Sequence, residues 1–254
     1  MHPVSTIARY VLIEARRSAL PWLALVAIAI ALALASFVSR VAITEGQQLR
    51  AVTGAALLRL CAVFFVAVHV AASMVRESAD KTMDLVLSQP VSRSAYYIGK
   101  LAGFAACGAL LSAFLSLPLL LWSAPAAVAG WAFSLAAESV LVAATCLFFA
   151  ITLTQALPAL AATAGLYLLA RSLAAMQAIA TWPLVSKRPL QEFAGWAIDL
   201  VGLLMPRLDA VTRSDWLAYG LPAAADYARA LAGIAVFIAL VTAAGMVDFQ
   251  RRNL

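Results

Sequence analysis

Charged residues are scarce in this chain. Asp, Glu, Lys and Arg together make up 12% of its 254 residues, and hydrophobic residues make up 65%. A typical soluble domain has about 25% charged residues. The mean hydropathy is +0.95, so the composition argues against a soluble protein and indicates one that crosses a membrane several times.

Cysteine and histidine are also few. Cys61, Cys107 and Cys146 all fall inside apolar runs, which argues against a disulfide framework or a zinc site. The two histidines, His2 and His69, and six scattered methionines form no convincing copper path. We therefore expect no metal site and no cofactor in the chain itself.

Six apolar runs are long enough to cross about 30 Å of hydrocarbon as helices. A membrane barrel would need shorter segments of alternating polarity, so the runs predict an all-α membrane protein. The predicted spans are residues 21–38, 57–75, 98–122, 133–153, 158–175 and 230–247. An even number of spans places both termini on the same side of the membrane.

The side is decided by the short connections. Nine Lys or Arg residues fall on each side of the predicted bundle, but six of the outer nine lie in or beside one long loop, residues 176–229. The positive-inside rule is weak for such a loop. The remaining segments predict that both termini lie in the cytoplasm. The first apolar run carries an Ala33-x-Ala35 cleavage pattern, but its leader is long for a signal peptide, so we expect it to be retained as a span.

Residues 5–20 read "STIARYVLIEARRSAL". A helix would place Ile7 and Val11 on one face and Arg9 and Arg16 opposite. This pattern predicts an interfacial helix at the inner membrane surface, before the chain enters the bilayer.

The loop at 176–229 is much longer than the other connections. Trp196 and Leu200 in it are four residues apart, so part of the loop is predicted to lie against the outer surface, or to re-enter the membrane partway. The uncharged links 123–130 and 152–159 are expected only to join antiparallel helices. With no internal repeat and no second domain, residues 1–254 form one predicted domain.

A polar segment, "ESADKTMDLVLSQPVSRSAYYIGK" (77–100), separates the second and third spans. Thr82 can cap a short helix over about 83–88, Pro90 can stop it, and Ser92 can cap the next span. A connection between two spans needs only about five residues. The segment is therefore either a docking element, with an apolar knob and a charged rim, or an amphipathic stretch on the inner leaflet. The pattern alone favours neither.

The residue pattern of this segment resembles that of the corresponding cytoplasmic segment of ABC type-2 permeases. Asp84 stands where the family pattern has glutamate, and the other matching positions are Thr82, Leu85, Leu87, Ser88, Pro90, Val91, Ser92, Arg93, Gly99 and Lys100. Lys81 stands where the family pattern has glycine. The resemblance assigns ATPase docking, through a coupling helix, to Glu77, Asp80, Thr82, Met83, Asp84, Leu85, Leu87, Ser88, Pro90 and Arg93.

The resemblance also implies partners. The sequence lacks a G-x-x-x-x-G-K-[ST] phosphate loop, so ATP and Mg²⁺ would be bound by a separate cytoplasmic ABC ATPase. A second permease subunit, identical or related, would complete the transporter. The stretch "LMPRLDAVTRSDWLAYG" (204–220) resembles the subgroup associated with multicopper-enzyme maturation, with Arg207 where asparagine is usual. A periplasmic accessory protein would fit that subgroup.

Polar side chains inside the spans are the remaining candidates. A carboxylate in a membrane span is costly, so the side chain of Glu138 must face the protein interior, reach the interface or pair with a cation. Arg59 is a suitable partner. Both form a predicted intramembrane polar site, for a substrate or for structure. Arg171 is expected at the outer end of the fifth span. His69 and Ser73 are four residues apart, but no acyl-transfer motif surrounds them, so no catalytic residue is expected.

These observations predict the transmembrane subunit of an ABC type-2 transporter, which couples ATP hydrolysis on a partner to movement of a substrate across or out of the membrane. One alternative is an ATPase-coupled subunit that transmits force or a signal to a periplasmic partner without moving cargo. Another is a membrane enzyme or scaffold without an ATPase. Nothing in the sequence indicates nucleic acid as a partner.

Overall fold

The computed structural model describes residues 3–42, 45–82, 88, 91–180, 196, 198, 200–202, 205–220 and 222–251. Every regular element in these residues is helical. The elements are α1 (Pro3–Arg17), α2 (Leu20–Val41), α3 (Gly46–Ala79), α5 (Arg93–Ser116), the 3₁₀ helix η1 (Leu117–Leu121), α6 (Pro125–Leu153), α7 (Ala156–Ala180), α9 (Leu208–Val211), α10 (Trp216–Tyr219) and α11 (Ala224–Arg251).

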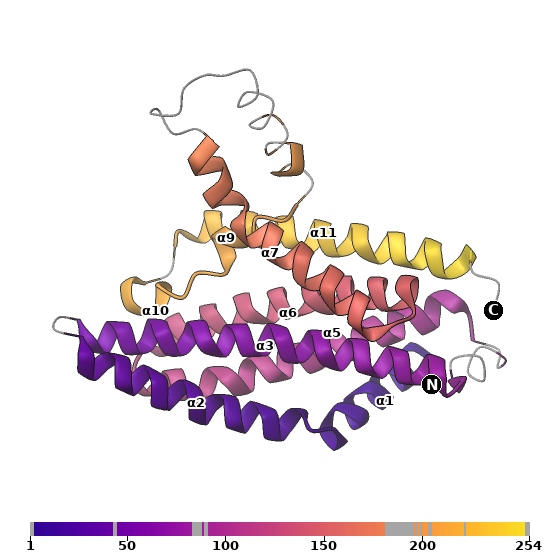
Figure 1. Ribbon diagram of the computed structural model, residues 1–254, viewed down its shortest axis with the longest axis horizontal. Coiled ribbons are helices and arrows are strands. Elements are labelled where there is room, and N and C mark those ends of the chain that lie inside the picture. Colours follow the sequence, from indigo (N-terminus) through magenta and orange to yellow (C-terminus); the bar gives the residue numbers. More distant parts are fainter. Residues whose placement is uncertain are drawn as a thin grey trace.

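Six helical segments are long and apolar enough to cross a membrane, so the six predicted spans are confirmed. The long helices run side by side, and both chain ends lie at the same end of the bundle as the connection between α3 and α5 (Figure 1). We call this the inner end, following the predicted orientation. The α2–α3 connection and α10 lie at the opposite, outer end.

α6 is the central helix. It contacts α3, α5, α7 and α11, and 67% of its most apolar window is buried. The corresponding values are 22% for α2 and 17% for α11. These two helices therefore leave the largest apolar faces uncovered by the rest of the chain.

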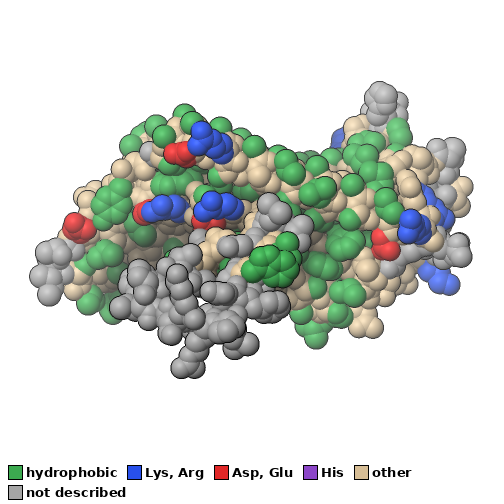
Figure 2. Space-filling model, turned by 90° about the horizontal axis from the view of Figure 1, so that it is seen from above, with side chains coloured by type: hydrophobic (Ala, Val, Ile, Leu, Met, Phe, Trp, Pro, Cys, Tyr) green, Lys and Arg blue, Asp and Glu red, His purple; other side chains and the backbone are tan. Residues whose placement is uncertain are grey.

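Charged side chains are unevenly distributed over the surface. On the face drawn in Figure 2 they form one group in the left half and another near the right end, and the stretch between the two groups is covered by hydrophobic and uncharged side chains. A bilayer core accepts such a belt, because exposed charge there is costly. The surface agrees with the six apolar helices in indicating a multi-pass membrane protein.

The helices extend beyond the apolar runs that predicted them. α3 begins at Gly46, eleven residues before the predicted span, and α6 begins at Pro125, eight residues before its span. Backbone hydrogen bonding continues a helix past its apolar part, and Pro125 suits a first turn. The predicted link at 123–130 is therefore wrong, because most of it is helix. The link at 152–159 is likewise shorter than predicted, since α6 ends at Leu153 and α7 begins at Ala156.

The N-terminal helix is seated on α5. A Cβ atom added at Gly99 would lie 2.9 Å from Cβ of Ile7, and one added at Gly103 would lie 2.6 Å from Cβ of Val11. Only glycine allows two helices to approach so closely. The predicted helix at 5–20 is present as α1, with Val11 completely buried. Its apolar face meets protein, so the prediction of a helix lying only on the membrane surface needs this correction.

The described parts of the long loop pack on the bundle. Leu208 and Val211 of α9 are completely buried, and α9 contacts α7 and α11. Trp216 of α10 is buried and its ring lies edge-on to the Tyr227 ring, with 5.4 Å between centroids. Residues 205–220 are thus part of the folded core at the outer end. Residues 181–195 lie outside the described residues.

Candidate functional site

The polar connection between α3 and α5 has firmly held ends. On the α5 side, the Ser92 hydroxyl accepts a hydrogen bond from the backbone N–H of Ala95 at 3.2 Å, which confirms the predicted N-cap. On the α3 side, Asp80 is the C-cap residue, and its N–H donates to the carbonyl of Arg76 at 2.9 Å. The side chain of Asp80 is exposed.

Part of the predicted docking element can be placed. Thr82 and Ser88 are both exposed at the inner end. Met83, Asp84, Leu85, Leu87 and Pro90 lie outside the described residues, and with them most of the predicted short helix.

Lys81 follows α3 in a left-handed backbone conformation, with φ = 52°. This conformation costs roughly 1–2 kcal/mol for a residue with a Cβ atom. Glycine adopts it freely, and glycine occupies this position in the permease pattern that the segment resembles. The backbone turn that glycine would favour is therefore present here with lysine.

Glu77, near the end of α3, bonds to two residues near the start of α5. We call these two helix ends the roots of the connection. One of its carboxylate oxygens, Oε2, accepts a hydrogen bond from the Tyr96 hydroxyl at 2.6 Å, and the other, Oε1, pairs with Nζ of Lys100. Tyr96 and Lys100 are four residues apart and share one face of α5. Lys100 is almost fully buried, with Nζ 5.8 Å from the centroid of the Phe104 ring. We call Glu77, Tyr96 and Lys100 the inner cluster.

The same roots also contact the end of the last helix. A guanidinium nitrogen of Arg93 donates to the backbone carbonyls of Phe249 at 3.4 Å and Gln250 at 3.2 Å. A cation suits this position, because the last carbonyls of a helix carry partial negative charge. The Phe249 ring stacks on Tyr96, with 5.8 Å between centroids. The connection is thus tied to α3, α5 and α11.

α1 contributes a further polar contact at the inner end. The Ser73 hydroxyl donates to a carboxylate oxygen of Glu14 at 2.9 Å. The His69 ring packs edge-on against Phe104, with 5.8 Å between centroids. Ser73 is therefore engaged by Glu14, and Glu14 is the acidic residue that interrupts the apolar pattern of α1. Within the described part of the chain, no three His, Cys, Asp or Glu side chains gather as a metal site.

A second polar cluster lies deep in the bundle. Glu138 on α6 is completely buried, and its Oε2 accepts from the guanidinium of Arg59 on α3 at 2.6 Å. Its other oxygen, Oε1, accepts from the hydroxyl of Tyr167 on α7 at 2.6 Å. Arg171 donates to the same hydroxyl at 2.9 Å and lies 3.7 Å from Oε1. We call Arg59, Glu138, Tyr167 and Arg171 the buried brace.

Arg59 has two more neighbours on α6. It donates to the hydroxyl of Ser134 at 3.0 Å, and its guanidinium carbon lies 5.0 Å from the centroid of the Trp131 ring. Desolvated cation–π contacts of this kind are worth about 2 kcal/mol. The brace therefore holds α3, α6 and α7 together, with Arg59 and Glu138 buried and Arg171 partly exposed.

The pairing of Glu138 with Arg59 was among the sequence-based hypotheses, and the structure brings the two side chains together. Both are almost completely buried between α3, α6 and α7, which the sequence alone did not predict. Tyr167 was missed altogether. The only signal for it was its spacing of four residues from Arg171.

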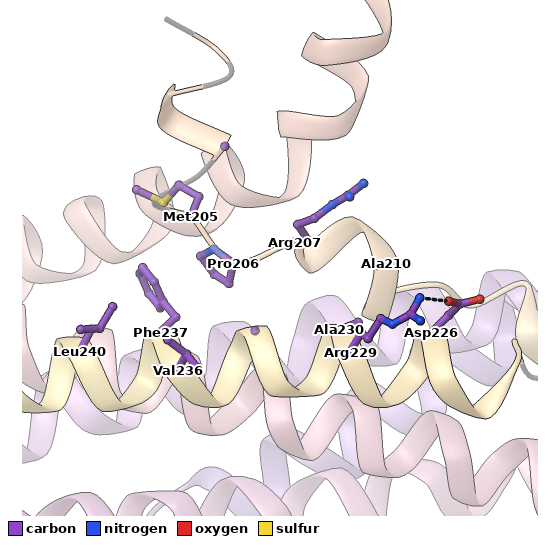
Figure 3. A pocket seen from close by; sticks show the side chains of 12 residues that line it. Met205, Pro206, Arg207, Ala210, Asp226, Arg229, Ala230, Val236, Phe237 and Leu240 are labelled. Atoms are coloured by element: carbon purple, nitrogen blue, oxygen red, sulfur yellow. Dashed lines mark hydrogen bonds and ion pairs between the residues drawn. The ribbon is translucent and has the colours of Figure 1, made fainter.

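The structure also contains two cavities that bear on the site. One of about 360 Å³ lies between α1 and α3 at the inner end, with both cations and carboxylates in its lining, among them Glu14 and Arg76. The other, of about 620 Å³, lies between α11 and a second wall formed by Gly202 and residues 205–210, and Phe237 points toward Met205 and Pro206 (Figure 3). We call the second cavity the α11 groove.

No protein-family model matches this sequence, and no curated protein matches it either.

Proposed function

We propose that this chain is the transmembrane subunit of an ABC type-2 transporter and works with a separate cytoplasmic ATPase that binds ATP and Mg²⁺. The proposal rests on the resemblance of residues 77–100 and on the way that segment is anchored. An exposed polar connection whose two roots share the carboxylate of Glu77 can move as one piece with the helices behind it. The chain is not expected to be an enzyme itself.

The anchoring suits a lever. A displacement of the connection would pass through Glu77 to α3, through Tyr96 and Lys100 to α5, and through Arg93 to α11. If the ends of the connection were not bonded to these helices, the connection could be displaced without moving the helices. ATP-driven closure of the partner could therefore bias the bundle between two arrangements.

A second subunit would complete the transporter. α2 and α11 leave large apolar faces, with Trp22 and Phe37 on α2 and Leu240 on α11 among the exposed side chains. An identical or related permease is the proposed occupant of part of this surface. Cargo would cross or leave the inner membrane, and lipid-like, peptide and ionic cargo remain alternatives.

The test is recovery of a bound ATPase. The tagged chain, purified from its native cells in mild detergent, should retain an ATPase and hydrolyse ATP. Leu85→Glu should abolish retention, because it places a charge in the apolar centre of the docking motif. Leu49→Glu, at the outer start of α3, is the matched control and should retain the ATPase. Isolation of the chain alone, even after crosslinking, would refute the proposal.

One observation favours a second function, transmission of force to a periplasmic partner. α9 and α10 pack on α3, α7 and α11, and two of these helices, α3 and α11, also hold the roots of the inner connection. Replacing residues 205–220 by a flexible linker of equal length removes α9 and α10 and with them these contacts. A cargo path should keep transport after this change, whereas a transmitting subunit should lose its activity.

A further inference from the structure

A groove on the outside of the bundle lies where α1 meets α2. It has a volume of about 470 Å³, and α1, α2 and α5 line it. The two N-terminal helices form an elbow there (Figure 1). We call this cavity the elbow groove; all three of its helices belong to the described residues.

The elbow is fixed by its own hydrogen bonds. The Ser18 hydroxyl donates to the carbonyl of Ala15 at 2.8 Å and accepts from the backbone N–H of Leu20 at 3.2 Å. One side chain thus closes the end of α1 and the start of α2, and Pro21 suits the first turn of α2. The bend between α1 and α2 is therefore stabilised locally by Ser18.

The rim of the elbow groove carries unbalanced positive charge. Arg9 and Arg16 line it, and no acidic residue does. They are seven residues apart on α1, about two turns or roughly 10 Å. Neither guanidinium forms a hydrogen bond or an ion pair with any described residue. Both are exposed, so two cations face the surroundings unpaired.

The floor of the groove is apolar. Leu110 and Phe114 of α5 line it and are partly exposed, at 64% and 39%, and the small side chain of Ala24 leaves room beside them. These residues belong to membrane spans, whereas Arg9 and Arg16 precede the first span. The groove therefore joins two cations on α1 to apolar side chains of α2 and α5.

The α11 groove provides a contrast. Its lining also includes two arginines, Arg207 and Arg229, but each has an acidic partner. Arg229 lies 3.2 Å from Asp226, and Arg207 lies 3.8 Å from Asp209 (Figure 3 shows the first pair). Charge that is already paired gives little attraction for an anion, so this groove lacks the feature that distinguishes the elbow groove.

We propose that the elbow groove binds an anionic phospholipid of the cytoplasmic leaflet, with the phosphate between Arg9 and Arg16 and an acyl chain against Leu110 and Phe114. Basic pockets beside membrane helices attract anionic headgroups, and each nearby cation contributes. The apolar floor selects an amphiphile over a free anion. This site is separate from ATPase docking, and it stands whether or not the chain is a transporter.

The test compares two double variants of the full chain. Arg9→Gln/Arg16→Gln removes the rim charge of the elbow groove, and Arg207→Gln/Arg229→Gln removes the same charge from the α11 groove. Each purified protein is mixed with equal amounts of phosphatidylglycerol and phosphatidylcholine in detergent, and retained lipid is counted by native mass spectrometry. Melting temperatures confirm that both variants are folded.

The wild type and the α11-groove variant should retain phosphatidylglycerol preferentially. The elbow variant should retain roughly ten- to thirtyfold less, the effect expected for two cations at the surface. Arg9→Lys/Arg16→Lys should keep most of the preference, which gives a second readout on a variant with unchanged charge. Excess sn-glycerol 3-phosphate should not displace the lipid.

Three results would overturn the inference. Equal losses in the two glutamine variants would mean that net charge, and not the elbow groove, attracts the lipid. An unchanged preference in the elbow variant would mean that the arginines do not bind it. Displacement by sn-glycerol 3-phosphate would reveal a site for a free anion.

Discussion

Glu77 in the inner cluster and Glu138 in the buried brace have the same kinds of partner. Each accepts a hydrogen bond from a tyrosine hydroxyl at 2.6 Å and pairs with a cation. The surroundings differ, since Glu138 is completely buried and Glu77 is 14% exposed. Glu138 also has a second cation, Arg171, within 3.7 Å.

This difference in exposure implies that the inner cluster can rearrange more easily than the buried brace. Water can reach Glu77 and replace a lost partner, so the inner cluster can rearrange at moderate free energy. Water is excluded from Glu138, and a partner lost there leaves a bare charge in a low dielectric. We infer that the brace keeps α3, α6 and α7 together while the inner end moves. Five substitutions test this contrast, from the largest expected effect to the smallest.

Glu138→Leu should be the most damaging. It leaves the guanidinium of Arg59, which is 1% exposed, without its carboxylate. Breaking a buried pair from one side costs about 3–5 kcal/mol. Unfolding in a denaturing-detergent titration measures the loss. The double variant Arg59→Met/Glu138→Leu should recover more than half of it, and absence of any recovery would show that the brace does not act as an ion pair.

Glu77→Gln should be milder in stability and clearer in function. It removes the charge opposite Lys100 but keeps a group that can accept from Tyr96, and hydrogen bonds to charged groups are worth about 1.5–3 kcal/mol. ATPase binding should persist, whereas the stimulation of ATP hydrolysis by the chain should fall. Glu77→Gln/Lys100→Gln is the charge-balanced control. Full stimulation in the single variant would argue against Glu77 as the link between the roots.

The two tyrosines give the most direct comparison. Tyr167→Phe and Tyr96→Phe each remove the tyrosine hydroxyl that donates a hydrogen bond to a glutamate. The first should cost about 1.5 kcal/mol and the second about 0.5 kcal/mol, because the carboxylate of Glu77 is 14% exposed and can accept from water instead, whereas that of Glu138 is completely buried. The same denaturing-detergent titration compares them. Equal costs, or a larger cost for Tyr96→Phe, would remove the distinction between the two clusters.

Arg171→Gln should have the smallest effect. Arg171 is 40% exposed and 3.7 Å from the carboxylate, so solvent screens much of its attraction. Exposed pairs are worth less than about 1 kcal/mol. A loss in the titration as large as that of Glu138→Leu would show that Arg171, and not Arg59, neutralises the brace.

Hydropathy predicted the six spans because each apolar run exceeds what a soluble core needs. Helix ends were less predictable, since the start of α3 at Gly46 depends on continued backbone bonding through polar residues such as Arg50. The N-cap at Ser92 was predictable because it is local. Sequence spacing could not fix the contact between Arg59 and Glu138, which are 79 residues apart. Such contacts depend on the order in which helices pack.

The account depends on what touches the inner connection, and crosslinking from Ser88 tests this most directly. Ser88 is exposed at the inner end. Ser88→Cys in a variant without the three native cysteines, treated with a short crosslinker in intact membranes, should join the chain to a cytoplasmic ATPase. Ala223→Cys, exposed before α11 at the outer end, should not. Efficient labelling of Ser88→Cys without any ATPase adduct would contradict the account.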